Sequence, residues 1–137
     1  MAPIRWAVSQ WQMTEYECDD PPRKVTPLVT ADLCGANGLS AGLYKLAPGD
    51  TSKNDIHEEE EIYYVVSGTG RLVMDGQSFA VEKGMVVYIP PRCWHQSTNL
   101  GSDELCYFWV FAPPPPGTPM YIAEGWARHE PRDRSLP

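Results

Sequence analysis

The sequence has no long hydrophobic run, few basic residues and no closely spaced pair of cysteines. Its apolar stretches are far shorter than the roughly 20 residues that a membrane-spanning helix needs, and the start, from Met1 to Trp6, lacks the apolar segment of a secretory signal. Eleven Lys and Arg against 18 Asp and Glu give a formal net charge of −7. Nucleic acid and anionic membranes both require a basic surface, so neither is an expected partner. We therefore expect a soluble, cytoplasmic protein.

The four cysteines, Cys18, Cys34, Cys93 and Cys106, include no C-x-x-C pair. This spacing argues against a zinc knuckle and against a thioredoxin-type redox pair. Without a secretory signal, we expect four reduced thiols that pack mainly as small apolar side chains.

Short strands joined by turns are the secondary structure that the composition favours. Fourteen prolines and 11 glycines in 137 residues interrupt the chain too often for a helical bundle. Asp75-Gly76 is a two-residue hairpin signal. About eight apolar or β-branched segments follow one another at turn-bounded intervals, which predicts an antiparallel sandwich or barrel. The predicted strands are Val25–Leu33, Leu39–Leu46, Glu61–Ser67, Arg71–Met74, Gln77–Val81, Met85–Ile89, His95–Asn99 and Glu104–Ala112.

The chain length allows one domain with one core. Residues 1–24 are interpreted as a largely irregular N-terminal extension that can supply a dimer-contact strand, and residues 25–112 as the barrel. Residues 113–137 begin with Pro113–Pro116, which cannot enter a sheet interior and should leave the barrel as an extended segment. The aromatic residues of this tail can dock on the barrel or on a partner subunit, and its last eight or so residues are expected to be loose.

Two of the three histidines lie beside predicted strands. His57 precedes Glu61–Ser67, and His95 begins the strand after Pro90-Pro91. The hairpin between them can bring both histidines to one side of a sheet, where Glu61 can join them. Imidazole and carboxylate ligands together suit Fe(II), Mn(II), Zn(II) or Ni(II). His129 lies in the polar tail and is interpreted as inert.

These residues fall into two motifs that resemble those of the cupins. Gly49-x5-Asp55-x-His57-x3-Glu61-x6-Gly68 resembles the first cupin motif, which supplies three metal ligands. Gly84-x5-Pro90-x-Arg92-x2-His95-x3-Asn99 resembles the second, which supplies the fourth. The resemblance implies an all-β, single-domain jelly-roll barrel with a divalent transition metal in its mouth, held by His57, Glu61, His95 and Asp55.

Two positions depart from the cupin pattern. Asp55 stands where the family has its first histidine, and Arg92 stands where it has a turn glycine. Arg92 is the lesser departure, because the Pro-Pro loop can adopt a different turn. If Asp55 is not a ligand, two histidines and Glu61 remain, the set that non-heme Fe(II) oxygenases use. If Asp55 binds, the site is harder and more anionic, which shifts its preference towards Mn(II) or Zn(II). Glu58, Glu59 and Glu60 are interpreted as a solvated acidic rim.

Strand alternation predicts which side chains line the cavity. Glu61, Tyr63 and Val65 share one face of their strand, so Tyr63 should face the cavity if Glu61 faces the metal. The same parity places Ser97 and Asn99 inward with His95. The expected substrate-pocket residues are Tyr44, Tyr63, Cys93, Trp94, Ser97, Asn99 and Trp109, with Phe111 as a further wall, and Tyr63 and Glu61 are the candidate catalytic residues.

Three functions remain open at this point. The first is a non-heme Fe(II) dioxygenase acting on a small organic molecule. The second is metal-assisted isomerisation, cyclisation or lyase chemistry, with Tyr63 or Glu61 handling the proton. The third is a non-catalytic module that binds a sugar-like molecule, which the departure at Asp55 keeps open. A homodimer is also expected, because the termini carry more large apolar side chains than loose ends should expose, namely Trp6, Trp11, Met120, Tyr121 and Trp126.

Overall fold

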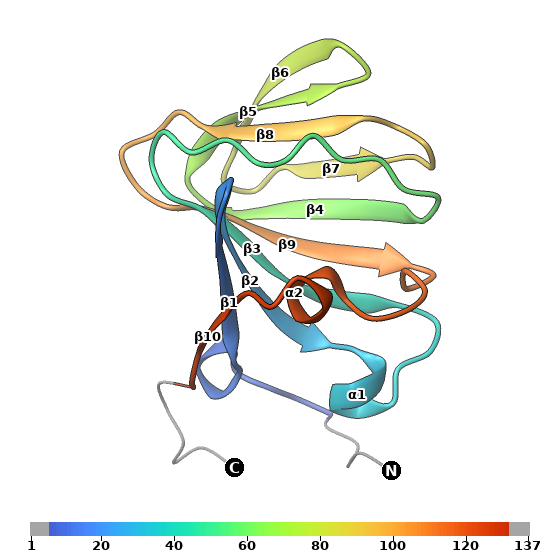
Figure 1. The fold of residues 1–137 in the computed structure, drawn as a ribbon. Helices are drawn as coiled ribbons and strands as arrows, with labels where there is room; N and C mark the ends of the chain where they lie inside the picture. The colour runs from blue at the N-terminus through green and yellow to red at the C-terminus, as the bar shows by residue number, and fades with distance from the viewer. Residues whose placement is uncertain (1–5, 132–137) are drawn as a thin grey trace.

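The computed structural model describes residues 6–131 and contains two antiparallel sheets. The larger has the strand order β10-β1-β2-β3-β9-β4-β7, and the smaller has the order β6-β5-β8 (Figure 1). This arrangement confirms the all-β jelly-roll prediction. The strands are β1 (Glu15–Asp19), β2 (Pro22–Val29), β3 (Ser40–Leu46), β4 (Glu60–Ser67), β5 (Thr69–Met74), β6 (Gln77–Glu82), β7 (Val86–Ile89), β8 (His95–Asn99), β9 (Leu105–Ala112) and β10 (Ala127–His129).

The core lies between the two sheets and follows strand alternation. In β4 the side chains of Glu61, Tyr63 and Val65 are buried, whereas Ile62, Tyr64 and Val66 are exposed, as the sequence predicted. The largest completely enclosed apolar side chains are Leu46, Val65, Leu72, Ile89, Leu105 and Tyr107. β4 therefore carries its polar Glu61 on the inner face of the barrel, beside apolar neighbours.

The predicted strand Val25–Leu33 is wrong at both ends. The strand runs from Pro22 to Val29, and a short helix, α1 (Ala31–Cys34), follows it. Thr30 caps this helix, because its hydroxyl accepts a hydrogen bond from the Leu33 backbone N–H at 3.2 Å. Gly35 ends the helix in the left-handed conformation with φ of 75°. Thr30 and Gly35 flank the helix as start and stop signals that the strand prediction passed over.

Both terminal segments pack on the barrel. The stretch around Glu15–Asp19, predicted to be irregular, is strand β1, and it pairs with β2 and with β10. After the proline run the chain forms the short helix α2 (Met120–Ala123) and returns as β10 (Figure 1). Tyr121 packs against Tyr16 with ring centroids 4.6 Å apart, and Trp126 is buried. The aromatic residues of the tail therefore dock on their own barrel. The residues expected to be loose lie mostly outside the described part of the chain.

Two further findings concern sequence-level expectations. The cysteines Cys18, Cys34, Cys93 and Cys106 are all unpaired thiols. Within residues 6–131, no helix combines the length and the apolar character that crossing a membrane would demand.

Candidate metal centre

Backbone pairing places the two histidines side by side. Asp55 forms an isolated β-bridge with His95, in which each backbone N–H donates to the other residue's carbonyl, at 3.0 and 2.9 Å. The Arg92 N–H donates to the His57 carbonyl at 2.8 Å, which fixes the segment two residues further on. As a result, the imidazole rings of His57 and His95 meet edge to face with centroids 4.9 Å apart.

Arg92 keeps the left-handed turn that a glycine would otherwise supply. Its φ is 58°, so this non-glycine residue takes up the sparsely populated left-handed conformation. The turn matters to the site, because its N–H is the group that holds His57.

Each histidine is fixed in the same orientation by a backbone carbonyl. The Nδ1 atom of His57 lies 2.9 Å from the Glu59 carbonyl, and that of His95 lies 2.9 Å from the Cys93 carbonyl. A carbonyl only accepts, so both Nδ1 atoms carry hydrogen and each neutral ring keeps its lone pair on Nε2. Histidines that bind metals are oriented in this way, with the second nitrogen donating to a carbonyl or carboxylate.

The two Nε2 atoms converge on one oxygen of Glu61. Oε1 of Glu61 lies 3.1 Å from Nε2 of His57 and 3.5 Å from Nε2 of His95. Glu61 and His95 are each only 4% exposed. Lone pairs on two nitrogens and a carboxylate oxygen repel one another unless a cation, either a proton or a metal, lies among them. The donor set therefore fits a divalent transition metal.

The electrostatics of His57 reflect the same convergence. Burial alone lowers the pKa of His57, but the hydrogen bond and the charge of Glu61 outweigh it, so the net shift of the pKa is upward. In the absence of a metal, a proton on His57 neutralises the buried carboxylate.

Asp55 completes a cluster of possible ligands. Asp55, His57 and His95 each offer a ligand atom, and these atoms all lie within 4.8 Å of one another. One carboxylate oxygen of Asp55 accepts a hydrogen bond from the Ile56 backbone N–H at 2.9 Å. The structure thus brings together all four residues that the motifs singled out: His57, Glu61, His95 and Asp55.

A cavity of ≈ 580 Å³ opens onto this cluster, a volume typical of small-molecule sites. Tyr44, Tyr63 and Trp109 line it as predicted, and Phe111 does so as well. Trp109 is able to form a wall because Gly42 lies directly opposite it in the sheet register. A Cβ atom on Gly42 would lie 2.6 Å from the indole ring.

Four of the predicted pocket residues, Cys93, Trp94, Ser97 and Asn99, are not among those that line the cavity. The Ser97 and Asn99 side chains do point inward, but their polar atoms form hydrogen bonds with other protein groups instead of facing the cavity. The Ser97 hydroxyl is hydrogen-bonded to the Tyr107 hydroxyl. The Asn99 amide donates to the carbonyls of Leu46 and Asp103 and accepts from the Gly101 N–H.

Cys93 and Trp94, the two loop residues, do not line the cavity, and the reasons are opposite. Cys93 is buried, and its carbonyl, rather than its thiol, serves the site by orienting His95. Trp94 is 48% exposed, and its backbone N–H donates to the Asp75 carboxylate on the hairpin between β5 and β6. Neither side chain reaches the cavity.

Sequence reasoning missed the side of the cavity formed by the termini. Arg23 and Val25 of β2, residues of α1, and the segment from Pro114 to Glu124 all line it. The only sequence signal was the concentration of aromatic residues in the tail, which indicated docking without indicating where.

The acidic rim is partly confirmed. Glu58 and Glu60 are exposed, whereas Glu59 is half-buried and lines the cavity. The Glu58 carboxylate lies 3.9 Å from the Arg92 guanidinium, and the Tyr88 hydroxyl donates to Glu60.

Two buried tyrosines lie within reach of the cluster. Burial, followed by the charge of Glu61, raises the pKa of Tyr63 well above its usual value. Burial also raises the pKa of Tyr44. Both phenols therefore keep their protons at neutral pH and can donate, but cannot act as bases.

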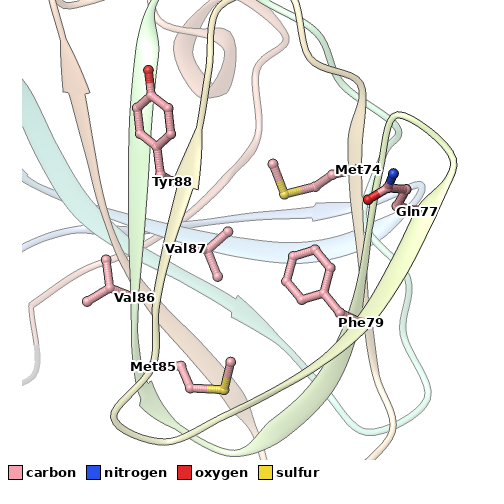
Figure 2. Close-up of a pocket in the computed structure, with 7 residues that line it drawn as sticks. All are labelled: Met74, Gln77, Phe79, Met85, Val86, Val87 and Tyr88. Carbon is pink, nitrogen blue, oxygen red and sulfur yellow. The ribbon is translucent and has the colours of Figure 1, made fainter.

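A second cavity, of ≈ 330 Å³, lies where the two sheets separate between β6 and β7. Figure 2 shows Val87 pointing towards Phe79 and Met74 across this opening. Its remaining lining residues are Gln77, Met85, Val86 and Tyr88. Histidine, cysteine and carboxylate side chains are absent from the described lining, so it offers no catalytic chemistry.

Comparisons with known proteins identify a family and several similar proteins. Residues 42–111 match the family model described as "Cupin domain". An uncharacterised protein of Methanocaldococcus jannaschii is 32% identical over 113 residues, which cover 74% of this chain and 86% of that protein. Gentisate 1,2 dioxygenase 1 of Aquipseudomonas alcaligenes is 32% identical over 62 residues, which cover 44% of this chain and 18% of that enzyme.

Solved structures are similar over most of the chain. A predicted oxalate decarboxylase from Thermotoga maritima has a TM-score of 0.71 at 20% identity, covering 78% of this chain and 98% of the other. At this identity the likeness concerns the fold.

Proposed function

The chain belongs to the cupin family, and from this premise we propose that it is a metal-dependent enzyme acting on a small organic molecule. Within this proposal the metal is Fe(II) and the reaction is a dioxygenation. One observation carries the proposal: the Nε2 atoms of His57 and His95 lie 3.1 and 3.5 Å from the same oxygen of buried Glu61.

His57, His95 and Glu61 would hold the metal on one side, and Asp55 would add a fourth ligand. Two histidines and one carboxylate are the set of non-heme Fe(II) oxygenases, and with Asp55 added an octahedral metal still has two open positions. Because the second carboxylate shifts the preference towards Mn(II) or Zn(II), the identity of the metal is the first thing to measure. When bound, Fe(II) supplies the electrons by which O₂ is activated. Similarity to gentisate 1,2 dioxygenase 1 supports this choice of reaction.

The remaining lining residues orient the substrate and exclude water. Tyr63, Trp109 and Phe111 provide aromatic walls next to the ligands. Such walls bind the apolar body of a substrate and lower the local dielectric constant, which strengthens polar interactions at the reacting end.

Metal-assisted isomerase, cyclase or lyase chemistry is the second candidate, and Tyr63 favours it. Burial and the charge of Glu61 raise the pKa of Tyr63, so its buried phenol keeps its proton at neutral pH and is present as a hydrogen-bond donor. In this candidate Tyr63 delivers a proton to the substrate, and Glu61 remains a ligand.

The test is elemental analysis of protein purified without a histidine tag. Iron at near-stoichiometric content supports the dioxygenase, and zinc or manganese supports the second candidate. His95→Ala should reduce metal content to less than about a tenth, because His57 and Glu61 alone hold a divalent cation weakly. The fold should persist in this variant, with loss only of the stability that bound metal adds.

His129→Ala is the matched control, because His129 pairs with Glu17 on the surface, at 2.8 Å. This variant should keep its metal content. Wild-type protein without metal, or His95→Ala protein with full metal content, contradicts both enzyme candidates; the first result is the one that a binding module predicts.

A further inference from the structure

A buried arginine lies in the wall of the metal-site cavity. Arg23 is on β2, and its side chain shares the inner face with Val25, two residues along the strand. It is 4% exposed and lines the same cavity as the histidine cluster. A permanently charged guanidinium in such a position requires an explanation, since burying a charge without an opposite charge is costly.

The contacts of Arg23 hold it in place but do not neutralise it. Nη1 donates to the Pro21 carbonyl at 2.8 Å, and Nη2 lies 4.0 Å from the Met120 sulfur. The guanidinium carbon lies 4.5 Å from the centroid of the Trp126 ring, a cation–π contact. In the described chain, residues 6–131, no carboxylate forms an ion pair with it. A guanidinium has five N–H donors, and these contacts leave some of them free to donate hydrogen bonds to an anionic ligand.

Arg23, Tyr44 and the metal-ligand cluster all line the same cavity. Tyr44 is paired in register with Val25, next to Arg23 along the inner face of β2. After burial, which raises the pKa of Tyr44, Arg23 lowers it while Asp55 and Glu61 raise it. The cavity therefore contains the Arg23 guanidinium, the His–carboxylate cluster and aromatic side chains, and the further charged residues Asp32, Lys53, Glu59 and Glu124 line it as well.

We propose that Arg23 binds a carboxylate group of the substrate, and that the substrate class is accordingly small carboxylic acids with an aromatic or apolar body. Arginine and carboxylate form two parallel hydrogen bonds, which fix orientation as well as position. Pro21, Met120 and Trp126 hold the guanidinium ready for this contact. The inference rests on the proposed function and extends it, because a substrate held by Arg23 would lie in the cavity that opens onto the cluster.

Calorimetric titration with benzoate and with benzamide tests the inference. The two probes have nearly the same shape and differ in charge. Wild-type protein should bind benzoate at least about tenfold more tightly than benzamide. Arg23→Gln should reduce benzoate affinity at least about tenfold and leave benzamide affinity within about twofold, so that the preference disappears. Arg23→Lys should retain part of the preference.

Loss of the Trp126 contact could loosen the C-terminal segment, so a second variant separates packing from charge. Trp126→Phe changes the packing beneath the guanidinium but keeps both the charge and an aromatic face. It should keep the preference for benzoate, while Arg23→Gln loses it. If Trp126→Phe loses the preference to the same extent, or if Arg23→Gln keeps it, Arg23 has only a structural role and the inference is overturned.

Repeating the titrations in His95→Ala protein separates this inference from the proposed function. An Arg23-dependent preference that survives without metal supports the inference, whichever reaction the cluster performs. A preference that disappears with the metal shows that the metal, rather than Arg23, bound the carboxylate, and it overturns the inference. Retention of metal in the His95→Ala protein would instead contradict the proposed function and leave the test of Arg23 intact.

Discussion

Single residues in this site are defined as much by what holds their backbone as by their own chemistry. His57 and His95 depend on the carbonyls of Glu59 and Cys93 for their tautomer. The motif spacing was sufficient to predict that these histidines and Glu61 converge, because that spacing reflects the barrel register. It could not identify the carbonyls, since any residue type supplies one.

Ser97 and Asn99 show the limit of strand parity. Parity placed both side chains inward, and both are buried. Whether an inward side chain reaches a cavity depends on which polar partners lie nearer. The Ser97 hydroxyl is hydrogen-bonded to the Tyr107 hydroxyl, and the Asn99 amide oxygen accepts a hydrogen bond from Gly101 in the loop after β8. Tyr107 lies on the neighbouring element β9 and Gly101 in the loop after β8, so the alternation of residues within β8 does not reveal these contacts.

Asn99→Ala should therefore affect stability and leave metal binding unchanged. The substitution leaves two carbonyls and one N–H without their partner in a fully enclosed position. We expect the free energy of unfolding to fall by about 3 kcal/mol, with each orphaned group costing about 1 kcal/mol or more. Urea denaturation measures the loss, and metal content should match that of wild type. If Asn99→Ala keeps the wild-type stability but changes metal or ligand binding, Asn99 belongs to the functional site.

Asp55 is predicted to be a true fourth ligand. Asp55→Asn keeps the backbone bridge to His95 but removes the negative charge, so the histidines stay in place. We expect metal affinity to fall at least about tenfold, and Glu61→Gln, which alters the oxygen nearest both histidines, to cause a larger loss. Competition with a chromogenic chelator measures both. Unchanged affinity in Asp55→Asn would reduce the site to His57, His95 and Glu61.

At the scale of elements, the barrel strands follow from the sequence and the terminal elements do not. β4, with its alternation of buried and exposed residues, and the Asp75-Gly76 hairpin carry strong local signals. β1 and β10 carry weak ones: β10 has three residues, all exposed, and is defined by pairing with β1. Short strands of this kind form because a partner edge is available, which only the folded barrel provides.

An ion pair joins β1 to the barrel and predicts a pH dependence. Glu15 on β1 accepts a hydrogen bond from the Lys45 amine of β3 at 2.7 Å, with side chains 20% and 12% exposed. Burial alone would raise the pKa of Glu15, but the hydrogen bond and charge of Lys45 outweigh it, so the pKa is lowered. The charged form is therefore stabilised in the folded protein. This contribution is present above the unfolded-state pKa and is lost as the pH falls through the folded-state pKa.

Glu15→Gln should accordingly lower the free energy of unfolding by about 1 kcal/mol at pH 7. The difference from wild type should shrink as the pH falls below 4.5, the ordinary pKa of a glutamate side chain. Urea denaturation across this pH range provides the measurement. Glu17→Gln is the matched control on the same strand: its pair with His129 is exposed, so a few tenths of a kcal/mol are expected. A difference for Glu15→Gln that stays constant with pH would contradict the argument.

At the scale of the whole molecule, the aromatic residues of the C-terminal tail dock on their own barrel, whereas Trp6 and Trp11 near the other end of the chain are 93% and 46% exposed. Trp126 is buried beneath Arg23, and Tyr121 packs on Tyr16. Other apolar side chains are exposed instead, on the outer face of the larger sheet near its β7 edge. Ile62 is paired with Tyr88 and Tyr64 with Val86 across β4 and β7, and Val66 continues the row. Each of these five side chains is between 37% and 63% exposed.

The homodimer prediction therefore remains, but it moves to this outer face of β4 and β7. Two copies that each carry a net charge of −7 repel one another, so an interface between them requires an uncharged surface. These five side chains are uncharged, with the Glu60 carboxylate at the end of the row accepting a hydrogen bond from Tyr88. A two-fold axis through them would let the same patch pair with itself. Light scattering at micromolar concentration should give about twice the 15.4 kDa of one chain.

Tyr64→Lys, which places a charge at the centre of the patch, should give a monomer. Val73→Lys is the matched control, because Val73 is 38% exposed on β5 of the smaller sheet, and it should leave the dimer intact. A wild-type mass near that of one chain, or a Tyr64→Lys variant that remains dimeric, would show that this face is not the interface.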